Sequence, residues 1–161
     1  LKSGGHTVDA YQETLYGGRW WQGRGVFTNN PTAQCVRCHA VAGSGGKVGP
    51  PMDNIGAMLT REQILESLIE PGARLAPGYG TVVITLKDGQ KVTGILEEET
   101  KDALLIRTSD AEPMEIAASR IQKRENMPSA MPAMGLMISK RELRDLIEFL
   151  SSLKQDQQAM N

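Results

Sequence analysis

The sequence has few of the residues from which most functional sites are built. Among its 161 residues are two cysteines and two histidines, and only 4% of the residues are aromatic. A structural zinc site with four cysteine and histidine ligands would need all four of these residues, including His6 in the polar N-terminal segment. The formal net charge is −1 and no basic run is present, so the composition gives no reason to expect nucleic acid or an anionic membrane as a partner.

Long apolar stretches are missing as well. No segment reaches the length of a membrane span, and no signal peptide is recognisable. The chain begins at Leu1 without an initiator methionine, so we expect a mature product or a domain of a longer protein. Its length suffices for one domain, or for a small domain with an insertion, and a large apolar cofactor would help to build a core that is poor in aromatic side chains.

Both cysteines lie in one motif, Cys35-Val36-Arg37-Cys38-His39. This is the spacing for attaching a c-type haem, in which each thiol joins one vinyl group and the histidine binds the iron. A thioredoxin-like dithiol needs a strand before the motif, whereas residues 23–34 have the pattern of a helix followed by a loop. The motif therefore favours haem c, with a disulfide and another metal site as alternatives, and it predicts a periplasmic or otherwise extracytoplasmic location.

Hydrophobic periodicity predicts helices in the first and last parts of the chain. A short helix is expected at residues 9–16 and another at residues 19–28. Capping-box sequences begin two more helices, one at Thr60 that ends before Pro71 and one at Ser139 that continues towards the C-terminus.

Between these helices the period of the apolar residues changes to two. Alternating residues predict strands, and Asp88-Gly89 predicts a hairpin turn between the first two of them. The expected strands lie at residues 81–87, 90–96, 103–108 and 114–117. We therefore expect a mainly α domain, made of residues 1–80 and 120–161, with a small antiparallel β-subdomain inserted at residues 81–119, so that the fold class is α+β overall.

A loop rich in methionine and proline follows the predicted strands and precedes the last helix. It contains Met127, Met131 and Met134, and Met137 follows shortly after it; a methionine sulfur from this region can bind the iron face opposite His39. Such a ligand favours ferrous iron, and a six-coordinate iron transfers electrons without a vacancy for substrate. Each methionine can instead fill space in the core, and His6 in place of a methionine would lower the reduction potential.

This arrangement resembles the mitochondrial-type cytochrome c fold, and in particular the haem-binding domain known from planctomycetes and related bacteria. The resemblance covers about residues 18–153. Beside the haem motif, it is carried by Gly23-Arg24-Gly25-Val26-Phe27, Val48-Gly49-Pro50, Asn54-Ile55-Gly56, Glu66-Ser67-Leu68-Ile69-Glu70-Pro71, Ala76-Pro77-Gly78-Tyr79, Lys87-Asp88-Gly89, Val92-Thr93-Gly94-Ile95-Leu96 and Ser129-Ala130-Met131-Pro132.

The resemblance implies a role for five residues of this chain. Cys35 and Cys38 would form the thioether bonds, and His39 would be the proximal ligand. Met131 would be the distal ligand, with Met127 as its main rival and Met134 next. The Pro50 carbonyl would accept a hydrogen bond from the proximal imidazole and so orient the ring.

Other residues have expected roles in packing. The resemblance places the crossing of the first and last helices at Gly23 and Phe27, against Phe149 or Leu150. Ile55 and Leu59 are candidates to line the haem, with ordinary core packing as an equal alternative. The pair Trp20-Trp21 is expected to have one side chain in the haem-side core and the other partly exposed, although such a pair can also mark a docking surface.

The predicted function is that of a single-haem domain that carries electrons between a periplasmic dehydrogenase and a downstream acceptor. The resemblance adds that such domains often occur fused to a dehydrogenase-like propeller, so the chain would be an electron-transfer domain and not itself an enzyme. The alternative is a gas-binding or sensing module with a displaceable methionine. Peroxidase chemistry is disfavoured because no second histidine follows His39.

Overall fold

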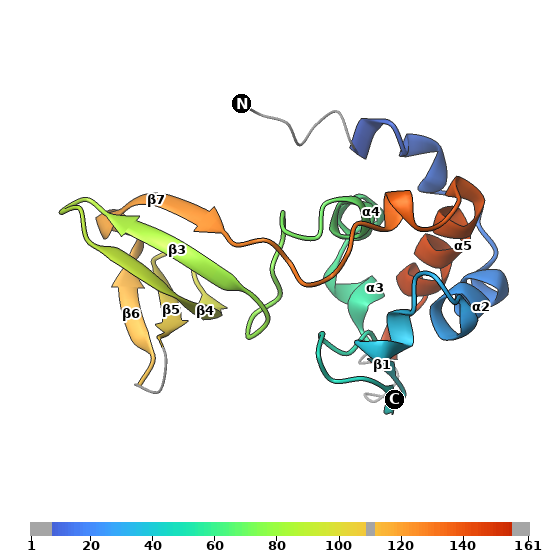
Figure 1. Cartoon of the computed structure of the whole chain (residues 1–161), viewed down its shortest axis with the longest axis horizontal. Coiled ribbons are helices and arrows are strands. Elements are labelled where there is room, and N and C mark those ends of the chain that lie inside the picture. Colours follow the sequence, from blue (N-terminus) through green and yellow to red (C-terminus); the bar gives the residue numbers. More distant parts are fainter. Residues whose placement is uncertain (1–7, 109–111, 156–161) are drawn as a thin grey trace. The chain divides into compact units, whose positions relative to one another are not determined.

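The chain folds into two compact units in a computed structural model that describes residues 8–108 and 112–155. Unit 1 is formed by Leu1–Pro71 and Met131–Asn161, and unit 2 by Gly72–Ala130. Helices occupy unit 1, and a five-stranded antiparallel sheet occupies unit 2 (Figure 1). The predicted α+β class is therefore confirmed, and the predicted insertion at residues 81–119 lies within unit 2.

Unit 1 contains three helices of nine residues or more and several shorter elements. Its elements are η1 (Gln12–Thr14), α2 (Trp20–Asn29), η2 (Cys35–Arg37), β1 (Ala40–Val41), β2 (Ser44–Gly45), α3 (Ile55–Met58), α4 (Arg61–Ile69), η4 (Met134–Leu136) and α5 (Lys140–Ser151). The predicted helices that begin near residues 19, 60 and 139 correspond to α2, α4 and α5. The segment at residues 9–16 forms helical turns that include η1.

Both predicted capping boxes are present. Thr60 Oγ1 accepts a hydrogen bond from Gln63 N at 3.2 Å, and Gln63 Oε1 accepts one from Thr60 N at 3.0 Å. Ser139 and Glu142 make the same reciprocal pair at 3.1 and 2.8 Å. Because each box satisfies two backbone N–H groups that have no partner within the helix, it fixes where α4 and α5 begin.

The core of unit 1 forms where α2 crosses α5. A Cβ atom at Gly23 would lie 1.9 Å from Asp145 O and 2.8 Å from Phe149 Cβ, so only glycine lets the two helices approach this closely. The rings of Phe27 and Phe149 pack with centroids 5.7 Å apart. The crossing implied by Gly23 and Phe27 is therefore confirmed, and Leu150 is buried beside it.

A buried carboxylate at the same crossing supports the first turn of α2. Asp145 is 6% exposed, and its Oδ1 accepts a hydrogen bond from Arg19 N at 2.8 Å. Arg19 is the N-cap residue of α2, and its own side chain makes no capping hydrogen bond. A carboxylate is favourable at a helix N-terminus, so α5 supplies the cap that the local sequence of α2 lacks.

Unit 2 is a small sheet with one buried face. Its strands are β3 (Thr81–Leu86), β4 (Lys91–Glu99), β5 (Ala103–Arg107), β6 (Met114–Ala117) and β7 (Ile121–Asn126), in the spatial order β6-β5-β4-β3-β7. The four predicted strands are confirmed, whereas β7 was not predicted. The hairpin turn is also present, with Gly89 at φ +89° and Asp88 Oδ1 accepting a hydrogen bond from Gln90 N at 2.9 Å.

Buried aliphatic side chains hold the strands of unit 2 together. Val82, Ile84, Leu86, Leu96, Leu104, Ile106 and Ile116 are each at most 5% exposed. The 3₁₀ helix η3 (Ala118–Arg120) leads into β7. Within the described residues, no helix is long and apolar enough to cross a lipid bilayer.

Candidate functional site

The two cysteines and His39 lie on a single turn of chain. Cys35 opens η2, and its carbonyl oxygen accepts hydrogen bonds from Cys38 N at 3.1 Å and from His39 N at 2.9 Å. A helical turn of this kind brings positions i, i+3 and i+4 to one side. Cys35 is half-buried, Cys38 is exposed, and no disulfide joins them. Two thiols and one imidazole are therefore presented together.

The chain that follows the motif folds back and holds this turn in place. Val36 O accepts a hydrogen bond from Gly46 N at 2.8 Å, and Cys38 O accepts one from Gly49 N at 2.8 Å. Strands β1 and β2 form a short hairpin between these contacts. Asp53 Oδ1 also accepts a hydrogen bond from Ala42 N, which lies in the turn of that hairpin. Backbone hydrogen bonds from the loop at residues 42–49 thus hold the Cys35–His39 turn in place.

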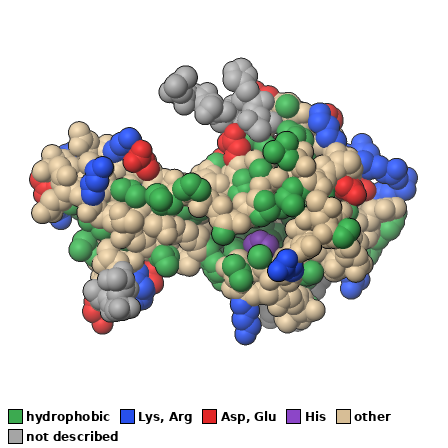
Figure 2. Space-filling view, in the orientation of Figure 1, with side chains coloured by type: hydrophobic (Ala, Val, Ile, Leu, Met, Phe, Trp, Pro, Cys, Tyr) green, Lys and Arg blue, Asp and Glu red, His purple; other side chains and the backbone are tan. Residues whose placement is uncertain are grey.

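The imidazole of His39 is oriented by two neighbouring backbone groups. Its Nδ1 lies 2.8 Å from Pro50 O, and because a carbonyl oxygen only accepts, Nδ1 carries the proton. The remaining nitrogen, Nε2, is therefore the basic one. A Cβ atom at Gly49 would lie 2.5 Å from Cε1 of the ring, so the ring packs directly on this glycine. Figure 2 shows the histidine at the surface with hydrophobic side chains beside it.

A histidine that ligates a metal nearly always donates its other ring nitrogen to a carbonyl or carboxylate. His39 has this arrangement toward Pro50, the residue for which the resemblance implied it. The role of either residue toward an iron stays a prediction. The donor set nonetheless fits a haem, because it offers a basic imidazole nitrogen and two thiols that no disulfide consumes.

The Cys35 thiol differs from the attacking thiol of a redox dithiol. Burial raises the pKa of the Cys35 thiol above its ordinary value. Catalytic dithiols need a lowered pKa at the attacking cysteine. No group of three or more histidine, cysteine, aspartate or glutamate side chains that could hold a metal ion occurs within residues 8–108 and 112–155. His6, the alternative distal ligand, lies outside the described residues.

The candidate distal methionines fall in different environments. Met131 is the first residue of the returning segment of unit 1, and it is partly buried against the core of that unit. Met134 is 2% exposed and belongs to the core itself. Met127 belongs to unit 2, is 44% exposed, and its N–H donates to Thr81 O at the end of β3. Met131 combines membership of unit 1 with an incompletely buried side chain, as does Met137, which follows η4.

The remaining expected residues are placed as follows. Ile55 begins α3 and Leu59 follows its last residue; both are partly buried and pack against the core of unit 1, a position that suits either haem lining or ordinary packing. Trp20 and Trp21 are 51% and 57% exposed, with an edge-to-face contact between their rings. The expectation that one of them packs in the core is wrong, because both side chains are more than half exposed.

Sequence analysis missed the supporting residues around the motif. Gly49 was named only within the segment Val48-Gly49-Pro50, although a glycine can mark a close approach of the backbone to a neighbouring ring. No sequence pattern identified Asp53 as a hydrogen-bond acceptor for the loop. Tyr11, which contacts the segment after Met131, also carried no signal, because that contact spans 124 residues.

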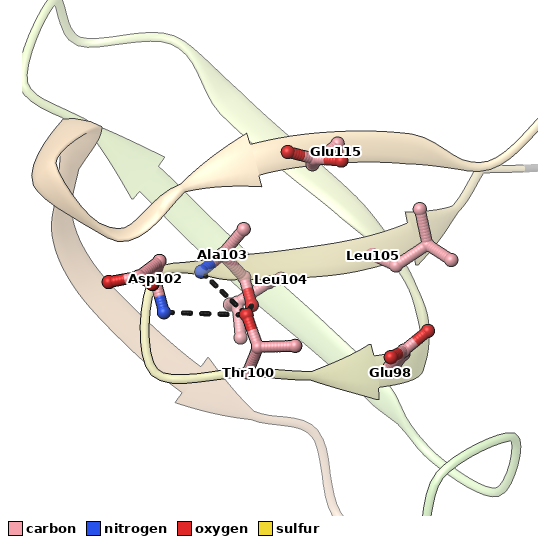
Figure 3. A pocket seen from close by; sticks show the side chains of 7 residues that line it. All are labelled: Glu98, Thr100, Asp102, Ala103, Leu104, Leu105 and Glu115. Atoms are coloured by element: carbon pink, nitrogen blue, oxygen red, sulfur yellow. Dashed lines mark hydrogen bonds between the residues drawn. The ribbon is translucent and has the colours of Figure 1, made fainter.

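A separate depression lies on unit 2, between β4, β5 and β6 (Figure 3). It is lined by Glu98, Thr100, Asp102, Ala103, Leu104, Leu105 and Glu115 and has a volume of about 220 Å³. Its polar contacts are internal, since Thr100 Oγ1 accepts hydrogen bonds from the backbone N–H groups of Asp102 and Ala103. Its lining has three carboxylates, no basic side chain, and one hydroxyl that is already engaged in the turn, so it has no evident chemistry.

Comparison with known proteins adds little to these observations. No protein-family model matches the chain, and no curated protein matches it. Among solved structures, the chain is similar to the crystal structure of SoxXA from P. pantotrophus, with a TM-score of 0.44 and 15% sequence identity, over 87% of this chain and 85% of that chain. A similarity at that level does not establish a shared fold, so the functional interpretation depends on the residues described above.

Proposed function

We propose that this chain is a single-haem c-type cytochrome domain that carries electrons, and that unit 1 has a cytochrome c-like fold. The observation that carries the proposal is the turn from Cys35 to His39, in which two thiols accompany an imidazole whose Nδ1 proton is held by Pro50 O. That hydrogen bond leaves Nε2 as a ready ligand. When bound, the haem would supply one-electron redox chemistry at its iron.

Met131 is the proposed distal ligand. It is supported by its place in unit 1, where its position relative to His39 depends on the packing of one unit only. Ligation by Met127 would depend on both units, because Met127 belongs to unit 2. A thioether on this side leaves no vacant position for oxygen or substrate, which favours electron transfer over catalysis.

The compartment and partners follow from the same proposal. Haem c is attached outside the cytoplasm, so we place the chain in the periplasm or an equivalent compartment. Its partners would be redox proteins: a dehydrogenase, either separate or fused to this chain, as electron donor, and a downstream acceptor. The near-neutral charge favours protein partners over polyanions.

Expression with export and haem c maturation tests the attachment. The purified chain should have the mass of the polypeptide plus one haem, with the haem retained after denaturation. Its reduced pyridine complex should have the spectrum of a haem with two thioether bonds. Cys35→Ala and Cys38→Ala should each shift that spectrum to one thioether bond. A known c-type cytochrome expressed under the same conditions serves as the positive control. If that control acquires haem and this chain does not, the proposal is refuted.

The distal ligand is tested by leucine substitutions, which conserve volume and remove only the sulfur. Met131→Leu should abolish the weak far-red absorption of the ferric protein that reports sulfur-to-iron ligation, and Met127→Leu, the matched control, should preserve it. Ferrous wild-type protein should resist carbon monoxide, whereas Met131→Leu should bind it. Rapid stoichiometric binding by the wild type would instead indicate the gas-binding module.

A further inference from the structure

The N-terminal segment of unit 1 contacts the chain just after Met131. Tyr11 Oη donates a hydrogen bond to Gly135 O at 3.2 Å. A Cβ atom at Gly135 would lie 2.6 Å from Tyr11 Oη and 3.1 Å from Ile69 Cδ1. Gly135 is thus packed between the tyrosine and α4, and no larger residue fits without displacing one of them.

Further contacts hold Tyr11 against this segment. Lys140 Nζ, in the first turn of α5, donates to Ala10 O at 2.8 Å, pairs with Glu13 and lies 5.2 Å from the centroid of the Tyr11 ring. Thr14 is 1% exposed, and its hydroxyl donates to Tyr11 O at 2.7 Å. The tyrosine is therefore fixed from both sides, and it can restrain Gly135 without moving itself.

The connection from Gly135 back to Met131 is short and stiff. Only Pro132 and Ala133 separate Met131 from η4, and the proline ring restricts its own φ angle. Ala133 is extended, with φ −69° and ψ 117°. At the other end of η4, Ile138 N donates to Met134 O at 3.1 Å. A restraint on η4 is therefore transmitted to the backbone of Met131.

We propose that Tyr11 is a positioning residue for the distal methionine, acting through Gly135. This inference rests on the proposed function, because it presumes that Met131 binds the iron. The hydroxyl of Tyr11 holds η4 against α4, and Pro132 passes that position to Met131. Loss of the hydroxyl lets the methionine-bearing segment leave its place more often while the rest of unit 1 keeps its packing.

Tyr11→Phe tests the proposal because it removes one hydroxyl and keeps the ring. The net loss of one hydrogen bond corresponds to about a fivefold rise in the population of the displaced segment. In the ferrous holoprotein, binding of carbon monoxide should therefore become about fivefold faster. Amide hydrogen exchange should also accelerate, and only within residues 131–138.

Tyr79→Phe, in unit 2, is the matched control and should leave both measurements at wild-type values. A wild-type rate and wild-type exchange for Tyr11→Phe overturn the proposal. So does accelerated exchange that extends equally to α2, since this would show a loss of stability throughout the unit. If wild-type protein lacks haem or the sulfur-to-iron band, the proposed function itself fails, which is a different result from either of these.

Discussion

Gly23 provides the sharpest test of how unit 1 is packed. A Cβ atom at this position would lie 1.9 Å from Asp145 O. Real Cβ atoms essentially never come within 3.0 Å of a heavy atom to which they are not bonded. Replacing Gly23 by alanine must therefore move α5 away from α2 by roughly 1 Å, in a core that is packed as densely as an organic crystal. Overpacking of this kind costs about 1–3 kcal/mol. Loosening the contact between Phe27 and Phe149 adds about 1 kcal/mol.

Gly25, two residues further along α2, supplies the matched control. Nothing lies within 4 Å of a Cβ atom built there. Alanine is more favourable than glycine inside a helix by about 1 kcal/mol, and both substitutions gain this propensity. We therefore expect Gly23→Ala to lower the free energy of unfolding by about 2 kcal/mol and Gly25→Ala to raise it by up to about 1 kcal/mol.

Urea unfolding followed by far-UV circular dichroism measures both effects. Wild type and both variants must be compared in the same state, either all with the cofactor or all without it. With a slope of about 2 kcal/mol per molar urea, the midpoint of Gly23→Ala should fall by about 1 M and that of Gly25→Ala should rise by up to about 0.5 M. Equal shifts for the two variants, or a Gly23→Ala midpoint at the wild-type value, would refute the close helix crossing.

Three further predictions concern the site and its support. Gly49→Ala would push the His39 ring away from Pro50 O and break the hydrogen bond between them. We therefore expect iron ligation to weaken about tenfold. The pH at which acid displaces the imidazole, read from the visible spectrum, should rise by about one unit. Asp145→Ala should destabilise the protein by about 1–3 kcal/mol in urea unfolding, because it leaves a helix N-terminal N–H unpaired, whereas Asp145→Asn, which keeps an acceptor, should cost less. In protein made without haem, iodoacetamide should modify Cys38 faster than Cys35, since Cys38 is exposed and burial raises the pKa of the Cys35 thiol. Peptide mass spectrometry measures the two rates, and equal rates would contradict this prediction.

The sequence predicted those elements whose formation depends on local signals. Capping boxes identified the starts of α4 and α5, and alternation with an Asp-Gly turn identified the first hairpin of the sheet. Strand β7 was missed because its sequence, Ile-Gln-Lys-Arg-Glu-Asn, has a single apolar residue and no alternation. It forms because it pairs with β3, whose own alternate residues Val82, Ile84 and Leu86 are buried in the core of unit 2. A strand of this kind depends on its partner and not on its own pattern.

The two sides of the candidate site differ in the same way. On the proximal side, the thiols, the imidazole and the Pro50 carbonyl lie within sixteen consecutive residues, so a motif describes them almost completely. On the distal side, the chain returns from unit 2 before it reaches Met131, and its position there depends on contacts such as that of Tyr11 with Gly135. Periodicity and spacing do not contain that information, because those contacts join residues more than one hundred positions apart.

The division into units is also what separates the rival distal ligands. The backbone N–H of Met127 donates a hydrogen bond to Thr81 O, so Met127 is held by the sheet of unit 2. A ligand bond from Met127 would therefore depend on residues of both units. Met131 begins the part of unit 1 that packs on the same core as the haem motif, so its ligation depends on unit 1 alone. On this argument the sheet can be inserted before the methionine without weakening the proposed iron site, provided that η4 stays anchored by Tyr11.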